Sequence, residues 1–216
     1  MTSHGFFTSR RLRTATFAVL AAAAFALSGC NSGGTPNSGG SPSPSATESA
    51  TPSATPTPTP TAAYKPADAT GRARNVPVPV LPEVAKTETK EGLEAFARYW
   101  FELLSYSYET GDTKQLEAVS DPNCAFCRGL SDNITAAWSE SKWVVGGQIE
   151  TPAVTAKVST GIPAQATVQV LQKTIAIHNL DGSLYQEPTK NMNTGSQATA
   201  TFGPAGWVLT DLGLIR

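Results

Sequence analysis

The chain has 216 residues, 40% of them hydrophobic, and its 16 basic and 17 acidic side chains give a formal net charge of −1. Residues 83–216 carry ten Lys or Arg and fifteen Asp or Glu, so this part of the chain has a net charge of −5. Such an acidic balance argues against binding to nucleic acid and against a basic face that docks on a membrane surface.

The N-terminus has the pattern of a bacterial lipoprotein signal. Three arginines near the start precede an Ala-rich apolar run over residues 14–27, and this order is typical of a secretory signal peptide. Ser28 and Gly29 lead into Cys30, which stands where such a signal places the cysteine that is lipidated. We therefore expect residues 1–29 to be removed. The mature chain is expected to be held through lipid on Cys30 at the outer face of the bacterial cytoplasmic membrane.

A plain signal peptide and a transmembrane anchor are the alternatives to lipidation. The apolar run over residues 14–27 is shorter than the ~20 residues that a spanning helix needs. Two acyl chains on Cys30 would supply the dual anchor that stable membrane attachment requires. The pair Arg10-Arg11 also suggests the twin-arginine export route, although Arg13 stands where that signal usually has an apolar residue.

Residues 30–82 are predicted to be a disordered linker that begins with the lipidated cysteine. From residue 31 to residue 63 the chain is rich in Gly, Ser, Thr, Pro and Ala, and Glu48 is its only charge. A segment with so little apolar surface cannot offset the entropy of ordering. The composition also resembles O-glycosylated stalks, so a glycosylated stalk and an unmodified spacer both remain open. Residues 65–82 are expected to form an extended, proline-interrupted strap on the domain surface.

Residues 83–216 are predicted to form one domain, because about 134 residues can bury a core large enough to fold without a staple. The strongest helix signal covers residues 89–110, where apolar side chains recur every three or four residues and so share one face. Thr87 or Thr89 can cap its start, and Gly111 suits a left-handed stop. Two further helices are predicted over residues 112–120 and 125–140.

Antiparallel strands are predicted to follow the helices. Their ranges are residues 143–150, 153–158, 164–178, 197–202 and 207–215. In the third range the apolar residues change from one face to the other, which requires a break or bulge near residues 171–173. Asp181-Gly182 is a turn signal, so the chain from Leu184 is expected to return antiparallel. Helices followed by antiparallel strands are the α+β pattern.

The order of these elements resembles the nuclear-transport-factor-like, or SnoaL-like, cone fold. The lipoprotein signal, the Pro/Thr linker, Tyr99-Trp100 and residues 121–127 (DPNCAFC) are together similar to a domain family of unknown function found in actinobacterial lipoproteins. The resemblance covers about residues 80–216. It implies three N-terminal helices packed on a strongly bent antiparallel sheet. Because the cone fold hosts both enzymes and non-catalytic binding modules, the resemblance implies no active site.

Cys124 and Cys127 are the only cysteines left once Cys30 is lipidated. Outside the cytoplasm a disulfide between them is expected. It can serve as a local staple for the third helix or as a redox site. The staple is favoured, because no βαβ pattern precedes the pair and no proline separates the cysteines. A second cysteine pair is absent from the sequence, so we predict no metal site.

Tyrosines of the long helix and one histidine are the candidates for a pocket. Tyr99, Tyr106 and Tyr108 can supply hydroxyl groups, and Trp100 an aromatic wall, although core packing explains the same residues. His178 is the only histidine of the mature chain. It can act as a base or lie solvated at the end of a strand. The candidate pocket residues are therefore Tyr99, Trp100 and His178, with no catalytic residue assigned.

These observations predict a non-catalytic binding or interaction module of the cell envelope. Its partner would be an unidentified envelope protein or ligand, and no cofactor is expected. The alternative is a cone-fold enzyme, isomerase-like or cyclase-like, that acts on a small hydrophobic molecule. Asp112, Asp121 and Asp132 can be matched to carboxylate bases of such enzymes, but a cap, a turn and a solvated helix position are the simpler explanations.

The shape of the cavity would separate the two functions. A deep pocket lined by His178, an aspartate and a tyrosine hydroxyl would favour the enzyme. A cavity filled by Phe96, Trp100 and Trp138 would argue against it.

Overall fold

The computed structural model describes residues 62–215. The predicted signal peptide over residues 1–29, Cys30 and the linker up to residue 61 lie outside the described residues. Within residues 62–215, no helix combines the length and the apolar character needed to cross a membrane.

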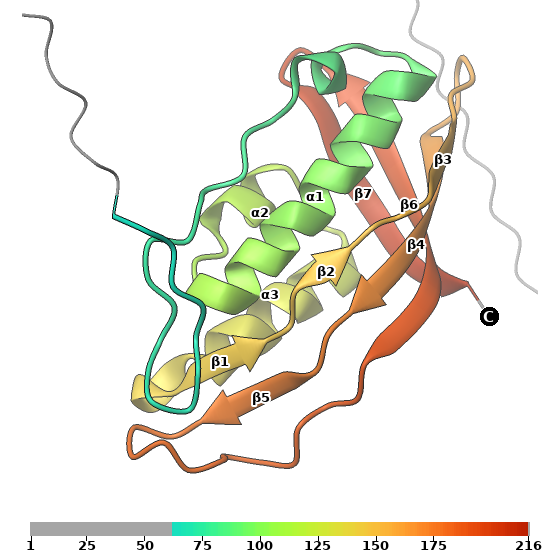
Figure 1. Cartoon of the computed structure of the whole chain (residues 1–216). Coiled ribbons are helices and arrows are strands. Elements are labelled where there is room, and N and C mark those ends of the chain that lie inside the picture. The colour runs from blue at the N-terminus through green and yellow to red at the C-terminus, as the bar shows by residue number, and fades with distance from the viewer. Residues whose placement is uncertain (1–61, 216) are drawn as a thin grey trace, which may run out of the picture. The chain divides into compact units, whose positions relative to one another are not determined.

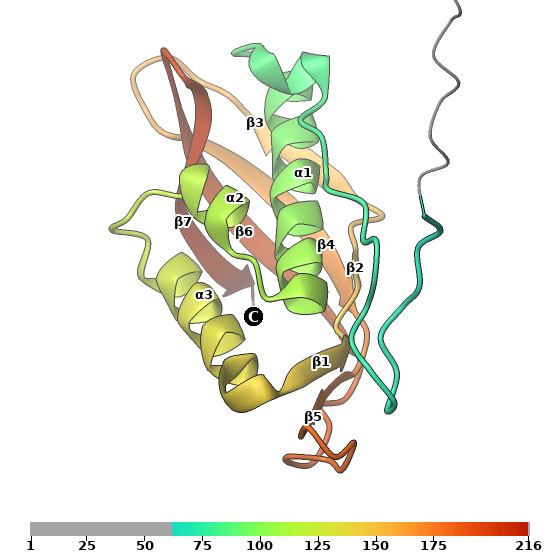
Figure 2. The ribbon, with the colours of Figure 1, turned by 90° about the vertical axis from the view of Figure 1, so that its left-hand side faces the viewer.

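The described part of the chain is mixed α+β. Its helices are α1 (Lys90–Thr110), α2 (Lys114–Ala118) and α3 (Ala125–Ala137), with the short 3-10 turns η1 (Glu83–Lys86) and η2 (Ser139–Ser141). Its strands are β1 (Trp143–Gly146), β2 (Ile149–Glu150), β3 (Val154–Lys157), β4 (Ala164–Gln172), β5 (Ile175–His178), β6 (Met192–Gly203) and β7 (Gly206–Ile215). The three α-helices lie on one side of the larger sheet (Figure 1, Figure 2). The predicted α+β class is therefore confirmed.

Helix α1 is delimited by two of its predicted signals. The Oγ1 atom of Thr89 accepts the N–H of Gly92 at 3.0 Å, and Gly111 ends the helix in the left-handed region at φ 76°. The predicted apolar face is buried, with every side chain at most 3% exposed: Leu93, Phe96, Ala97, Trp100, Leu103 and Leu104. This face packs against β3 and β4, so α1 forms one wall of the core.

Helices α2 and α3 are shorter than predicted. The carboxylate of Asp112 accepts the N–H of Lys114, the first residue of α2, at 3.1 Å, but α2 covers only five residues. Helix α3 stops before the predicted residue 140, because Glu140 and Ser141 have φ values of 54° and 65°. A right-handed helix cannot contain positive φ values.

The strands form two antiparallel sheets. The larger has the order β2-β4-β6-β7, with β3 also paired to β4, and the smaller joins β1 to β5. The long strand predicted over residues 164–178 is divided, since β4 ends at Gln172 and β5 begins at Ile175. The predicted break is therefore confirmed, and the chain passes there from one sheet to the other. Gly146 and Gly147, with φ of 83° and 78°, separate β1 from β2 in the same way.

Strand β6 is longer than predicted and the segment before it is less regular. Leu184, expected to start a returning strand, makes only an isolated bridge to His178. Strand β6 starts at Met192 instead of residue 197. The side chains that it buries are small and are at most 3% exposed: Ser196, Ala198 and Ala200.

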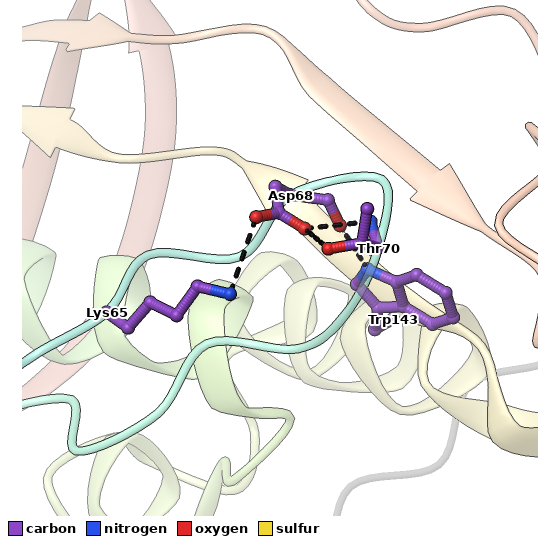
Figure 3. A network of polar contacts seen from close by, with 4 residues as sticks. All are labelled: Lys65, Asp68, Thr70 and Trp143. Atoms are coloured by element: carbon purple, nitrogen blue, oxygen red, sulfur yellow. Dashed lines mark hydrogen bonds and ion pairs between the residues drawn. The ribbon is translucent and has the colours of Figure 1, made fainter.

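Residues 62–82, here called the strap, lie against the domain. The strap turns at residues 68–71, where the Asp68 side chain accepts hydrogen bonds from Thr70 and lies 3.6 Å from the ammonium group of Lys65. The indole N–H of Trp143, the first residue of β1, donates to the carbonyl oxygen of Asp68 at 2.9 Å (Figure 3). The turn therefore covers Trp143, which is only 4% exposed.

Further contacts join the strap to α1 and to the segment before β1. The hydroxyl of Tyr64 donates to Glu109, near the end of α1. The guanidinium group of Arg72 donates to the carbonyl oxygen of Lys142 at 3.2 Å and lies 5.2 Å from the centre of the Trp138 ring. The composition of the chain places residues 62–82 in the linker, whereas these contacts attach them to the domain.

Candidate functional site

Two of the candidate pocket residues lie in the core of the domain. Tyr99 and Trp100 are 8% and 0% exposed. The indole N–H of Trp100 donates to Ser120 Oγ at 2.8 Å, and its ring meets Phe101 edge to face with centroids 5.2 Å apart. Trp100 is thus held by packing and by a hydrogen bond, as expected of a core residue.

His178 lies elsewhere, at the end of β5. Its ring stacks on Trp143 with centroids 5.7 Å apart and an interplanar angle of 17°. Its Nδ1 atom is 2.8 Å from the carbonyl oxygen of Gly182. His178 is only 7% exposed, so it does not lie free in solvent. The structure does not bring His178 together with Tyr99 and Trp100.

Cys124 and Cys127 lie at disulfide distance, as expected, with Cα atoms 5.3 Å apart. Both are buried, at 1% and 3% exposure. Cys124 is also the N-terminal cap of α3, since its Sγ accepts the N–H of Cys127 at 3.2 Å. A buried pair that caps a helix fits a structural staple better than a redox site, which needs an accessible sulfur.

A groove between the helices and the smaller sheet has the composition of a binding site. It has a volume of about 440 Å³ and lies between the end of α1, the second half of α3, strands β1 and β5, and the loop after β5. Its apolar lining consists of Ile134, Ala136, Ala137, Val144, Ile175 and Ile177. The polar groups at its wall come from Tyr108, Asn133, Lys142, Tyr185, Gln186 and Thr189.

The two-residue period of the strands explains why apolar side chains gather in the groove. Ile175 and Ile177 are two residues apart on β5 and therefore share one face. Val144 is the register partner of Ile177 on β1, so their side chains lie beside each other. Lys142 is two residues before Val144, and it lines the same groove.

Lys142 is a buried cation at the wall of the groove. It is 6% exposed. Its ammonium group lies 3.0 Å from Glu140 Oε2 and 4.3 Å from the centre of the Tyr185 ring, a cation–π contact. The side chain of Glu140 is 81% exposed. The charge of Lys142 is therefore paired with a carboxylate that remains in contact with water.

The backbone before Lys142 is strained. Glu140 and Ser141 are consecutive residues other than glycine in the left-handed region, a conformation that costs on the order of 1–3 kcal/mol for each residue. The backbone of Lys142 is held on both sides, by its N–H to Ser139 at 3.0 Å and by the bond from Arg72 to its carbonyl. Strain that is held by the surrounding contacts gathers at binding and catalytic sites.

Tyr108 is the one candidate tyrosine of α1 that lines the groove. Burial raises the pKa of Tyr108, and a hydrogen bond with Gln172 opposes this shift only in part. The phenol therefore stays neutral near pH 7. The backbone carbonyl of Tyr108 accepts the indole N–H of Trp138 at 3.1 Å, which fixes the end of α3 against α1.

The acidic candidates lie outside the groove. Asp121 and Asp132 line a second pocket of about 350 Å³ beside Cys127, together with Arg128. Asp121 accepts the N–H of Asn123 at 2.7 Å, which is the turn role that the sequence also allowed. Among residues 62–215, no three His, Cys, Asp or Glu side chains are grouped as a metal site would require.

Comparisons with known proteins show what the chain is similar to. The family described as "Family of unknown function (DUF6318)" matches residues 62–213. No curated protein matches the sequence. The intermembrane space region of the chloroplast protein ARC6 is similar in structure at 12% identity, over 59% of this chain and 97% of that chain, with a TM-score of 0.44. A protein from Catenulispora acidiphila is similar at 11% identity, over 57% and 91% of the two chains, with a TM-score of 0.39.

Proposed function

We propose that this chain, which belongs to the family of unknown function DUF6318, is a lipid-anchored, non-catalytic binding module of the bacterial cell envelope. The single observation that carries the binding role is the groove of about 440 Å³ with apolar walls and one buried cation. Ligand sites combine such walls with a few placed polar groups, in volumes of about 300–1,000 Å³. The lipid anchor is carried by the sequence around Cys30.

The chemistry of the groove supports binding over turnover. A general acid or base must lie within hydrogen-bonding reach of the reacting group. Among the residues that the structure describes, no Asp, Glu, His or Cys side chain lines the groove. Its two tyrosines and one lysine can orient a ligand but form no pair of nucleophile and base. The composition of the groove therefore favours a binding module, and a cone-fold enzyme is the second candidate function.

We also propose that the domain is a cone of the nuclear-transport-factor-like type. Two features support it. The chain crosses between the two sheets at Lys173-Thr174, between β4 and β5. Helix α1 packs on strands of both sheets, β1 of the smaller and β3 and β4 of the larger. This arrangement places the groove at the smaller sheet, between the ends of α1 and α3.

The groove is testable with a neutral apolar fluorophore, N-phenyl-1-naphthylamine, whose emission rises in an apolar site. The wild-type domain is expected to bind it. Ala136→Trp is expected to abolish binding, because the exposed Ala136 lines the groove and an indole there fills the space. Thr135→Trp is the matched control, since Thr135 is the exposed neighbour on α3 and does not line the groove. Equal emission in the two variants would contradict a binding groove.

The anchor is testable through Cys30. Wild-type protein expressed in its host is expected to sediment with membranes and to incorporate an alkynyl fatty acid. Cys30→Ala is expected to lose the label and to leave the membrane fraction, because one acyl-bearing residue provides the whole attachment. The double variant Cys124→Ala/Cys127→Ala keeps Cys30 and controls for loss of other thiols. Membrane sedimentation that survives in Cys30→Ala would rule out the proposed anchor.

A further inference from the structure

We infer that the groove binds a small amphipathic carboxylate, with its apolar body against Ile175 and Ile177 and its carboxylate on the ammonium group of Lys142. The inference rests on the proposed function, since it assumes that the groove is the binding site. It goes further because it names the class of ligand and the residue that recognises it.

The burial of Lys142 requires an anion. An ammonium group that is removed from water is stable only when it is paired. Within the described residues, the carboxylate recorded within ion-pair distance of Lys142 is that of Glu140, at 3.0 Å. The Tyr185 ring on its other side is polarisable but neutral. The site therefore has one position for a carboxylate, at the rim of an apolar space.

Glu140 holds that position with an exposed side chain. Only the carboxylate end of Glu140 contacts Lys142, since 81% of the Glu140 side chain is exposed. An ion pair that water can reach contributes little to stability. When a ligand carboxylate replaces it, Lys142 stays paired and Glu140 returns to water. The groove can thus exchange an internal carboxylate for an external one at small cost.

A second cation contacts the backbone of Lys142. The guanidinium group of Arg72 lies against the carbonyl oxygen of Lys142 at 3.2 Å. Tyr108, whose pKa is raised by burial, contributes no negative charge near pH 7. Among residues 62–215, the carboxylate recorded in contact with the ammonium group of Lys142 is that of Glu140. Once Glu140 is displaced, the buried ammonium group of Lys142 needs another anion as its partner.

The carboxylate site is testable by displacement of N-phenyl-1-naphthylamine from the folded domain. Decanoate and decan-1-ol have chains of the same length and differ in the charged head group. Decanoate is expected to displace the probe at about tenfold lower concentration, because a charge-assisted bond is worth about that factor in affinity. Lys142→Gln is expected to remove this advantage. Lys157→Gln, an exposed lysine on β3, is the matched control and is expected to retain it.

Glu140→Gln keeps the size and the backbone of Glu140 but removes the competing charge. It is expected to strengthen decanoate binding several-fold, opposite in sign to Lys142→Gln. This variant leaves the buried lysine in place, so it decides the matter even if Lys142→Gln fails to fold.

The two proposals fail in different ways. If decanoate and decan-1-ol displace the probe equally, or if Glu140→Gln weakens decanoate, the carboxylate site is wrong while the groove stands. If the wild-type domain does not bind the probe, the groove itself is not a binding site and the proposed function loses its main support. A preference for decylammonium over decanoate would also overturn the inference.

Discussion

Substitution of Trp100 by alanine is expected to lower the free energy of unfolding by about 3–5 kcal/mol. Trp100 is 0% exposed and lies at the centre of the buried face of α1. Removing its ring leaves a cavity that the neighbouring side chains can fill only in part. The variant is expected to unfold at much lower urea concentration than the wild type, by circular dichroism.

Trp100→Phe separates the two contributions of this residue. It keeps most of the aromatic packing but loses the bond to Ser120 Oγ, which accounts for about 1 kcal/mol. Because Trp100 does not line the groove, folded protein of either variant is expected to bind the neutral probe as the wild type does. If a Trp100 variant were as stable as the wild type but did not bind the probe, Trp100 would be a pocket residue, which is the role that the sequence also allowed.

The helical part of the fold could be predicted from the sequence because its signals are local. The apolar spacing from Leu93 to Leu104 defines one face within a single segment. Thr89 and Gly111 act on backbone groups a few residues away, so they mark the ends of α1 without knowledge of the rest of the chain. The signal for the break after Gln172 was equally local, because the apolar residues on its two sides alternate on opposite faces of the strand.

Strand β6 was predicted only in part because its signal is spread over other strands. Its buried positions hold Ser196, Ala198 and Ala200, which have little hydrophobic pattern. Its first residues are ordered by their partners on β4, where Met192 faces Gln172. Because these paired residues are twenty positions apart in the chain, no local sequence pattern predicts their pairing.

The candidate site was predicted least well. Tyr108 was named among three tyrosines, but nothing in the sequence separates it from Tyr106. Nothing in the sequence predicted that Lys142 is buried, because a lysine that follows two polar residues and precedes a tryptophan is usually exposed to solvent. Its ammonium group lies 4.3 Å from the centre of the Tyr185 ring, and its carbonyl oxygen is bound by Arg72, 70 residues away in the chain. The left-handed residues 140–141 contain no glycine that would have marked the turn.

A chain that starts at residue 83 is expected to be less stable than one that starts at residue 62, by at least about 3 kcal/mol. The shorter chain loses the hydrogen bonds from Tyr64 to Glu109, from Arg72 to Lys142 and from Trp143 to Asp68. It also exposes the Trp143 ring to water. For a domain of this size the melting temperature is expected to fall by roughly 10 °C, with a red shift of tryptophan emission as Trp143 becomes solvated.

The matched control is a chain that lacks only residues 31–61, which removes linker sequence but keeps every strap contact that the structure describes. Its melting temperature is expected to equal that of the full mature chain. Equal stability and equal emission for the chain that starts at residue 83 would show that the strap is linker, as its composition suggests. The expected loss would instead make the strap part of the folded domain, where Arg72 holds the carbonyl oxygen of Lys142.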